Sequence, residues 1–256
     1  MKLIDTHAHL FSHQFDVDRH AMVGRALQVC SHLLLPNIDE TTIASMNALA
    51  AAYPGHCLPT VGLHPTYVAA DYPRQLALLE AELERGGYYG VGETGLDLYW
   101  DKTSLARQQE SLAEHIRWAR HYQLPLILHT RSANEETLRQ IEAAQDGSLR
   151  GLFHCFSGTA EEGKRMIAAG FHLGIGGTLT YKRSELPAVL PELDPAWLVL
   201  ETDSPYLAPV PYRGKRNESA YLVHVAEKLA EVLQMDRQTV VEQTSRNARA
   251  LFDLPA

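Results

Sequence analysis

The sequence predicts an α/β protein with a single-domain TIM-type (β/α)8 barrel. Eight short apolar, β-rich runs recur along the 256 residues, and stretches with helical periodicity separate many of them. Repeated βα units imply a parallel sheet with crossover helices, and eight units in about 250 residues match the usual size of this barrel. A doubly wound open sheet is the alternative. No flexible linker or repeated motif divides the chain, so we expect residues 1–256 to form one domain.

The predicted strands and the clearest helices can be placed in chain order. The apolar runs are Leu3-Ile4, Leu33 to Leu35, Leu58 to Leu63, Tyr88 to Val91, Pro125 to Leu128, Leu152-Phe153, Phe171 to Ile175 and Trp197 to Leu200. Helical spacing links Leu105, Leu112, Ile116 and Ala119, and later Leu222, Val225, Leu229 and Val232.

The bulk composition indicates a globular protein of the cytoplasm. Apolar residues make up 45% of the chain, and no apolar stretch approaches the roughly 18 residues that cross a bilayer. Neither an export signal nor a membrane association is therefore expected. The three cysteines lack C-x-x-C spacing, which argues against a disulfide framework or a thiolate zinc site. The net charge of −8 argues against a broad basic face that coats nucleic acid, although a local basic site can still bind a few phosphates.

Several predicted strands end at a histidine or an acid, and these ends are regularly spaced. Each βα unit between them spans 25 to 36 residues. The carboxyl ends of barrel strands surround one mouth, so side chains far apart in sequence should converge there. The residues are His7, His9, His64, Glu93, His129, His154 and Asp203.

This set of imidazoles and carboxylates is typical of a divalent-metal site. His7 and His9 lie two residues apart, so in a strand both rings can reach one ion. Six groups exceed the three protein ligands usual for one catalytic zinc, which favours two ions bridged by Glu93. Zinc, manganese or cobalt suits the ligands best, and magnesium stays possible. His64 has the right position, but six ligands suffice without it, and Asp5 is a candidate to orient a ligand ring.

Three other motifs are rejected. Residues 90–95 have the spacing of a dinucleotide-binding loop, but Glu93 would repel phosphate and no helix is predicted to follow. We expect the glycines around Glu93 to let the chain approach the metal ions instead. Residues 158–164 have P-loop spacing without the Ser or Thr that binds magnesium, which indicates a loop before an ordinary helix. Cys155 should point away from His154 and take no part in catalysis.

Basic residues near the predicted mouth bear on the substrate. Arg131 follows His129, and Arg213 begins a cluster that extends to residue 216. Both are placed to hold a phosphate beside the ions. Lys182-Arg183 is interpreted as a solvated loop.

The chain resembles the TatD family of metal-dependent deoxyribonucleases and hydrolases from Met1 to about Phe252. The matching segments are DTHAHL, GLHP, GETGLDLYW, LPLILHTR, FHCFSG, ETDSPYLAPVPYRGKRN and NARALF. Ser132 and Ser219 depart from the family pattern, outside the predicted ligands. The resemblance implies a TIM barrel, two divalent ions, and hydrolysis of DNA phosphodiesters, in some members as a 3′ to 5′ exonuclease. The positions that match the family's metal ligands are His7, His9, Glu93, His129, His154 and Asp203.

We expect attack by a metal-bridging water, with Glu93 as the bridge and Asp203 as the base. Arg131, Arg213 and His64 would contact the substrate, which is DNA or a nucleotide phosphodiester. Two alternatives remain open: a small-molecule amidohydrolase or lactonase, and a non-catalytic protein that binds metal and nucleic acid.

Overall fold

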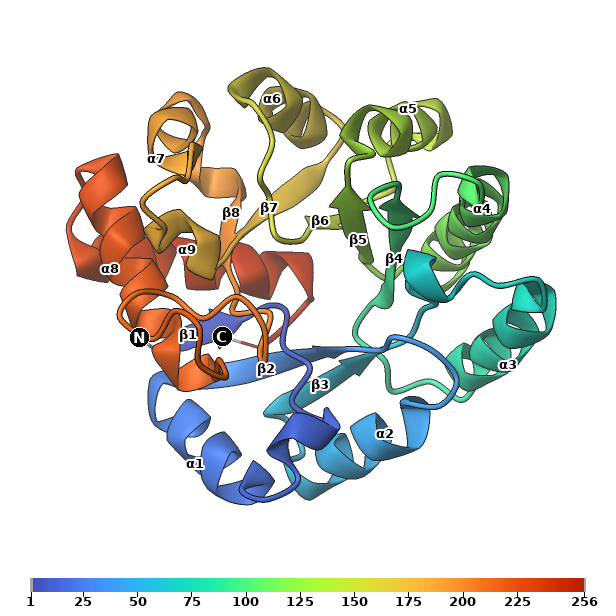
Figure 1. Cartoon of the computed structure of the whole chain (residues 1–256), viewed down its shortest axis with the longest axis horizontal. Helices are drawn as coiled ribbons and strands as arrows, with labels where there is room; N and C mark the ends of the chain where they lie inside the picture. The colour runs from blue at the N-terminus through green and yellow to red at the C-terminus, as the bar shows by residue number, and fades with distance from the viewer. Residues whose placement is uncertain (1, 256) are drawn as a thin grey trace.

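The computed structural model describes residues 2–255, and within them eight parallel strands form a barrel that helices surround (Figure 1). The strands are β1 (Leu3–Asp5), β2 (Cys30–Pro36), β3 (Cys57–Thr60), β4 (Val91–Asp97), β5 (Leu126–Arg131), β6 (Gly151–Phe153), β7 (Phe171–Ile175) and β8 (Leu198–Leu200). The helices are α1 (Arg19–Val29), α2 (Ile43–Ala52), α3 (Tyr72–Glu84), α4 (Leu105–Tyr122), α5 (Asn134–Ala144), α6 (Ala160–Ala168), α7 (Leu186–Val189), α8 (Leu222–Leu233) and α9 (Arg237–Leu251).

Backbone contacts close the sheet into a barrel. The strands run in the orders β1-β2-β3 and β4-β5-β6-β7-β8, with every pair parallel. A bridge between Val61 and Val91 joins β3 to β4. On the other side, the Thr6 amide donates to the Leu200 carbonyl at 3.0 Å, and Ala8 pairs with Ser204. The predicted TIM barrel is therefore confirmed, and the open-sheet alternative is wrong.

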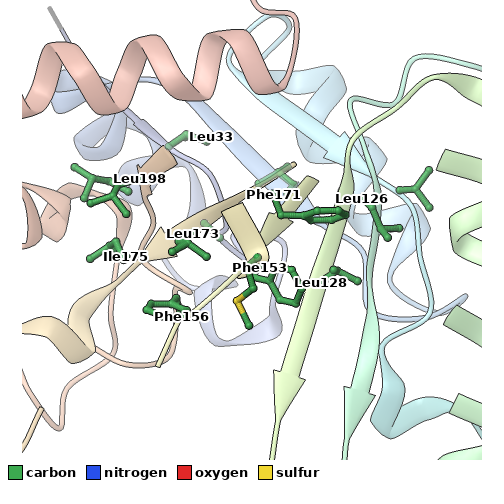
Figure 2. Close-up of a cluster of buried hydrophobic side chains, with 14 of the residues drawn as sticks. Leu33, Leu126, Leu128, Phe153, Phe156, Phe171, Leu173, Ile175 and Leu198 are labelled. Atoms are coloured by element: carbon green, nitrogen blue, oxygen red, sulfur yellow. The ribbon is translucent and has the colours of Figure 1, made fainter. Parts of the chain in front are cut away.

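Alternating side chains divide the apolar core into two layers. The outer layer lies between strands and helices, and Figure 2 shows part of it, including Phe153 and Phe171, whose ring centroids are 5.3 Å apart. The intervening strand residues form a second, separate cluster with the C-terminal segment. That cluster contains Ile4, Leu34, Leu58, Ile127, Leu152 and Val199 from six strands, with Ala248, Leu251, Phe252 and Leu254.

Two motifs with the spacing of nucleotide-binding loops, residues 158–164 and residues 90–95, have other roles in the structure. Residues 158–164 lead directly into α6, which begins at Ala160 with a capping box in which Thr159 and Glu162 satisfy each other's backbone amides. The anion-binding end of α6 is thus already occupied by a carboxylate of the chain. This confirms the loop and helix that the sequence predicts.

The glycines beside Glu93 serve the packing of strands. A Cβ on Gly92 would lie 2.5 Å from the Ile127 carbonyl oxygen, and one on Gly95 would lie 2.1 Å from that of His129. Both glycines have positive φ. The neighbouring backbone of β5 therefore requires both glycines, and the expectation that they let the chain approach metal ions stays a prediction.

No helix within residues 2–255 is both long and apolar enough to span a membrane.

Candidate metal centre

Seven side chains that the sequence singles out meet at the carboxyl ends of the strands. The inward alternation of the barrel places several of them, because Ile127 and Leu152 in the apolar interior are followed two residues later by His129 and His154. The groups His7, His9 and Asp203, and His64, Glu93 and His129, each bring their nitrogen or oxygen atoms within 4.8 Å of one another. His154 lies between them, 3.1 Å from Glu93.

Glu93 stands between two groups of histidines. Its Oε2 atom lies 3.3 Å from His7 Nε2 and 3.5 Å from His9 Nε2. Its Oε1 atom lies 3.1 Å from both His129 Nδ1 and His154 Nε2. The two carboxylate oxygens thus face different imidazole sets, an arrangement that suits a bridging ligand.

Further contacts fix the orientation of the histidine rings around Glu93. His9 Nδ1 lies 3.1 Å from the Pro36 carbonyl, which leaves its Nε2 facing inward, 3.4 Å from Asp203 Oδ1. His7 stacks on His154 with ring centroids 3.8 Å apart. These contacts orient each ring before anything binds.

Two buried acids that sequence reasoning missed lie next to His129 and His154, on the side of each ring that faces away from Glu93. Asp97 Oδ2 lies 3.1 Å from His129 Nε2, and Glu201 Oε1 lies 3.4 Å from His154 Nδ1. Asp97 can accept a hydrogen bond from His129 Nε2 and so leave Nδ1 of that ring free as a ligand, whereas Glu201 lies near His154 Nδ1 without a hydrogen bond to it. A signal was available, because Asp97 shares a strand face with Glu93, and Glu201 precedes Asp203 by two residues.

His64 belongs to the cluster, whereas Asp5 does not orient a ring. His64 Nε2 lies 3.2 Å from His129 Nδ1 and 3.5 Å from Glu93 Oε1, and Thr66 holds the other nitrogen. Asp5 instead accepts hydrogen bonds from the Thr202 amide and hydroxyl and from the His7 backbone amide. The expected contact of Asp5 with a ligand ring is therefore wrong; it joins β1 to the chain after β8.

Mutual electrostatics keep the acids ionised. Burial alone would raise the pKa of Glu93, but the surrounding imidazoles of His7, His154 and His64 hold it well below its usual range. Burial opposes ionisation of Asp203 in the same way, and the hydrogen bond from His9 with neighbouring imidazoles lowers its pKa. Both carboxylates are anions at neutral pH.

The donor set fits divalent cations. His7 Nε2 lies 3.2 Å from His9 Nε2, and the His64 and His129 nitrogens approach equally closely. Nitrogens this close compete for the same proton, whereas a cation shared between neutral rings satisfies both. His7 Nδ1 is buried without a hydrogen-bond partner. Burial lowers the pKa of this ring and favours its neutral, metal-binding form, whereas the neighbouring carboxylates outweigh burial and raise the pKa of His9, His129 and His154.

The basic residues fall into different environments. The Arg131 guanidinium lies over the Tyr99 ring, 3.8 Å from its centroid, and forms no ion pair within the part of the chain from 2 to 255. Arg213 contacts Tyr181 and lines a cavity of about 280 Å³ together with Arg183. Arg183 lines this open cavity, but Lys182 and Arg183 are both exposed, as expected for a solvated loop.

Arg216 cannot join Arg213 in holding an anion. Its two terminal nitrogens donate to Asp18 at 2.7 and 2.8 Å, and one also donates to the Gln14 carbonyl. Arg216 thus anchors the loop after β8 to the loop after β1. The predicted anion-binding cluster of residues 213–216 therefore loses Arg216, whereas Arg213 and Lys215 are exposed.

Cys155 is half-buried, and burial raises the pKa of its thiol to about 12. A neutral thiol is a poor nucleophile. Its backbone amide donates to Glu201 Oε1 at 2.6 Å, so this position helps to hold the acid behind His154.

The chain is therefore a (β/α)8-barrel protein. Its histidines and carboxylates cluster at the mouth of the barrel in an arrangement typical of metal sites. A sequence model described as TatD related DNase matches residues 4–253, and the chain belongs to this family. It is 32% identical over 252 residues to the uncharacterized metal-dependent hydrolase YabD of Bacillus subtilis, covering 98% of each chain. It is 30% identical over 259 residues to the 3'-5' ssDNA/RNA exonuclease TatD of Yersinia pseudotuberculosis, covering 98% of this chain and all of the relative. The crystal structure of YjjV, a TatD homolog from Escherichia coli, superimposes with a TM-score of 0.93 at 30% identity, covering 99% of this chain and 98% of that one.

Proposed function

We propose that this protein is a metal-dependent phosphodiesterase that acts on DNA or another nucleic acid and uses two divalent ions. The observation that carries the proposal is the position of Glu93, whose oxygens face separate histidine sets. His7, His9 and Asp203 would hold one ion, and His129 and His154 the other, with Glu93 shared between them. Family membership and the relatives named as a hydrolase and an exonuclease support the same function.

The acidic residues of the site have different proposed roles in the reaction. When bound, the ions supply positive charge that lowers the pKa of water and stabilises the charge that develops on a phosphate. Asp203 is the more accessible acid, with a side chain 14% exposed against 3% for Glu93, so it is placed to accept the proton of an attacking water. Glu93 stays a buried ligand. Asp97 and Glu201 keep the imidazoles of His129 and His154 in their binding orientation.

Substrate contacts come from the rim. Arg131 lies two residues beyond His129 on β5, and its planar guanidinium can donate two parallel hydrogen bonds to a phosphate while it rests on Tyr99. Arg213, beside the cavity after β7, is placed to hold a second phosphate of an extended chain. His64 serves as an additional contact at the ion held by His129.

The test is turnover by metal-stripped protein to which zinc, manganese, cobalt or magnesium is returned singly. The substrates are single-stranded DNA, duplex DNA, RNA, and small esters and amides. We expect nucleic-acid cleavage that a chelator abolishes and that His7→Ala removes. Hydrolysis of amides or lactones alone would assign the protein to small-molecule chemistry. Metal and DNA binding without turnover of any substrate would make it a binding protein.

Ion number can be measured directly on the same samples. Elemental analysis of reconstituted protein should approach two metal ions per chain, and Glu93→Gln should bind fewer, because it loses the charge shared between the two sets. A value of one ion in the active unmodified protein would contradict the bridging arrangement.

A further inference from the structure

A pair of exposed aromatic rings stands beside the metal centre and is not used in the chemistry described above. Tyr99 is 56% exposed and Trp100 is 70% exposed, in the loop between β4 and α4. Their rings meet edge to face with centroids 4.9 Å apart. Large exposed aromatic surface costs solvation free energy and therefore commonly marks a binding surface.

This exposure is concentrated at the mouth. Within residues 2–255, seven of the eight large apolar side chains that the surface exposes lie in loops between a strand and the next helix, and Leu78 on α3 is the exception. Such loops carry the active sites of TIM barrels. The apolar rim therefore surrounds the end of the barrel that holds the histidines.

One carboxylate connects the aromatic pair to the metal centre. Asp97 Oδ1 accepts hydrogen bonds from the backbone amides of Tyr99 and Trp100, at 2.9 and 3.3 Å, while its Oδ2 faces His129 Nε2. Asp97 also pairs in register with Arg131 on β5. The turn that presents the rings is thus fixed relative to a proposed metal ligand.

Arg131 places a positive charge beside the aromatic pair of Tyr99 and Trp100, which we call the platform. A nucleotide that binds there needs this charge for its phosphate. Its guanidinium lies 3.8 Å from the Tyr99 ring centroid and 5.4 Å from that of Trp100. The same three side chains therefore offer stacking faces and a cation within one patch. A nucleotide has this combination, a flat base joined to an anionic phosphate.

We propose that Tyr99 and Trp100 stack against an unpaired nucleobase of the substrate, next to the phosphate that Arg131 holds. This inference deepens the proposed function and rests on it. A base inside a duplex already stacks on both faces, so the platform favours single-stranded ends. It also makes affinity depend on the base as well as on the phosphate backbone.

The experiment compares a short single-stranded DNA with the same strand carrying base-free tetrahydrofuran residues. Trp100→Ala should raise the KM for the base-containing strand by about 10-fold, with kcat changed little, because stacking on an aromatic ring contributes to binding. Its KM for the base-free strand should equal that of the unmodified protein. Trp100→Phe should restore most of the affinity, and Leu78→Ala is the control at a comparably exposed apolar residue.

A binding measurement separates failure of this inference from failure of the proposed function. Base-containing strand should quench the fluorescence of the exposed Trp100, and Trp100→Phe should lose that quenching while it retains base-dependent binding measured by calorimetry. Base-dependent binding without cleavage would overturn the proposed function and leave the platform in place. Equal binding of both strands by the unmodified protein, or equal losses for both strands in Trp100→Ala, would overturn the platform.

Discussion

At the scale of single residues, the two acids in contact with His7 and His9 differ in accessibility, and this difference separates their proposed tasks. Glu93 is enclosed by imidazoles, whereas Asp203 is at the open side of the cluster. Both are ionised, because neighbouring histidines outweigh the effect of burial on their pKa. The accessible anion is the better proton acceptor, and the enclosed anion is the better permanent ligand.

Replacement of the accessible acid should separate binding from turnover. Asp203→Asn keeps an oxygen that can coordinate a cation but cannot take up a proton at neutral pH. We expect kcat to fall by about 10²- to 10⁴-fold, the usual contribution of a general base, while most of the bound metal is retained. Single-turnover rates and metal content measured on one preparation check this. Activity near that of the unmodified protein would refute the assignment of Asp203 as the base.

The residues of the histidine–carboxylate cluster could be predicted from the sequence, but the contacts of the acids Asp97 and Glu201 with its rings could not. His129 and His154 could be predicted because apolar alternation leads directly to them. The contacts of Asp97 and Glu201 depend on which ring nitrogen faces inward, which chain alternation does not specify. The partner of Arg216 was equally hidden, because Asp18 is 198 residues away in sequence.

At the scale of secondary-structure elements, α4 supports the strand end that carries His64. The ring of His115 on α4 is fully buried, and its Nε2 accepts a hydrogen bond from the Leu63 amide at 2.9 Å. Its Nδ1 lies 2.7 Å from the Ser111 carbonyl, which fixes the proton there. The sequence places His115 outside the ligand pattern, and its contacts show a structural reason for its burial.

His115 should make stability depend on pH in a predictable direction. Burial lowers its pKa to about 4, against about 6.5 in an unfolded chain. Between these values the unfolded state binds a proton that the native state does not. The contribution of His115 to the free energy of unfolding should therefore have its full value above about pH 6.5. It should decrease, on the order of 1 kcal/mol per pH unit, as the pH is lowered toward about 4.

Urea unfolding of His115→Gln across this pH range measures the effect. Glutamine can still accept from the Leu63 amide but does not titrate, so its stability should fall less steeply than that of the unmodified protein. His121→Gln, at an exposed position of the same helix, is the matched control and should follow the unmodified curve. Equal slopes for His115→Gln and the unmodified protein would rule out the contribution of this ring.

The order of elements could be predicted because each apolar run overlaps a strand of the structure, although the run from Tyr88 to Val91 reaches only the first residue of β4. What the sequence did not reveal at this scale was the packing of β4 on β5. Gly92 and Gly95 lack a Cβ because backbone atoms of β5 lie within 3 Å of where one would be. Such contacts are set by the neighbouring strand and leave no local pattern except the glycines themselves.

At the scale of the whole molecule, the barrel interior is polar at one end and apolar at the other. The C-terminal segment fills the apolar end, where Phe252 is only 3% exposed and packs in one cluster with Ile4 and Leu34. This separation of the two ends allows stability and catalysis to be altered independently.

Phe252→Ala tests that independence. Removal of a buried aromatic ring should lower the free energy of unfolding by about 3 to 5 kcal/mol through lost burial and a new cavity. Metal affinity and KM of the remaining folded protein should stay unchanged, because the substitution lies at the opposite end of the interior. Phe252→Leu should lose less. A drop in metal affinity that parallels the drop in stability would show that the two ends are coupled.

The seam between β1 and β8 has a consequence for how the protein is made on the ribosome. His7 and His9 are synthesised about 200 residues before their partner Asp203, and Thr6 is synthesised 194 residues before Leu200, whose carbonyl accepts from its amide. The residues that fill the apolar end, such as Phe252, come later still. A nascent chain therefore has neither a closed barrel nor a full set of proposed ligands. His7 and His9 can form the site only after β8 and Asp203 have been synthesised.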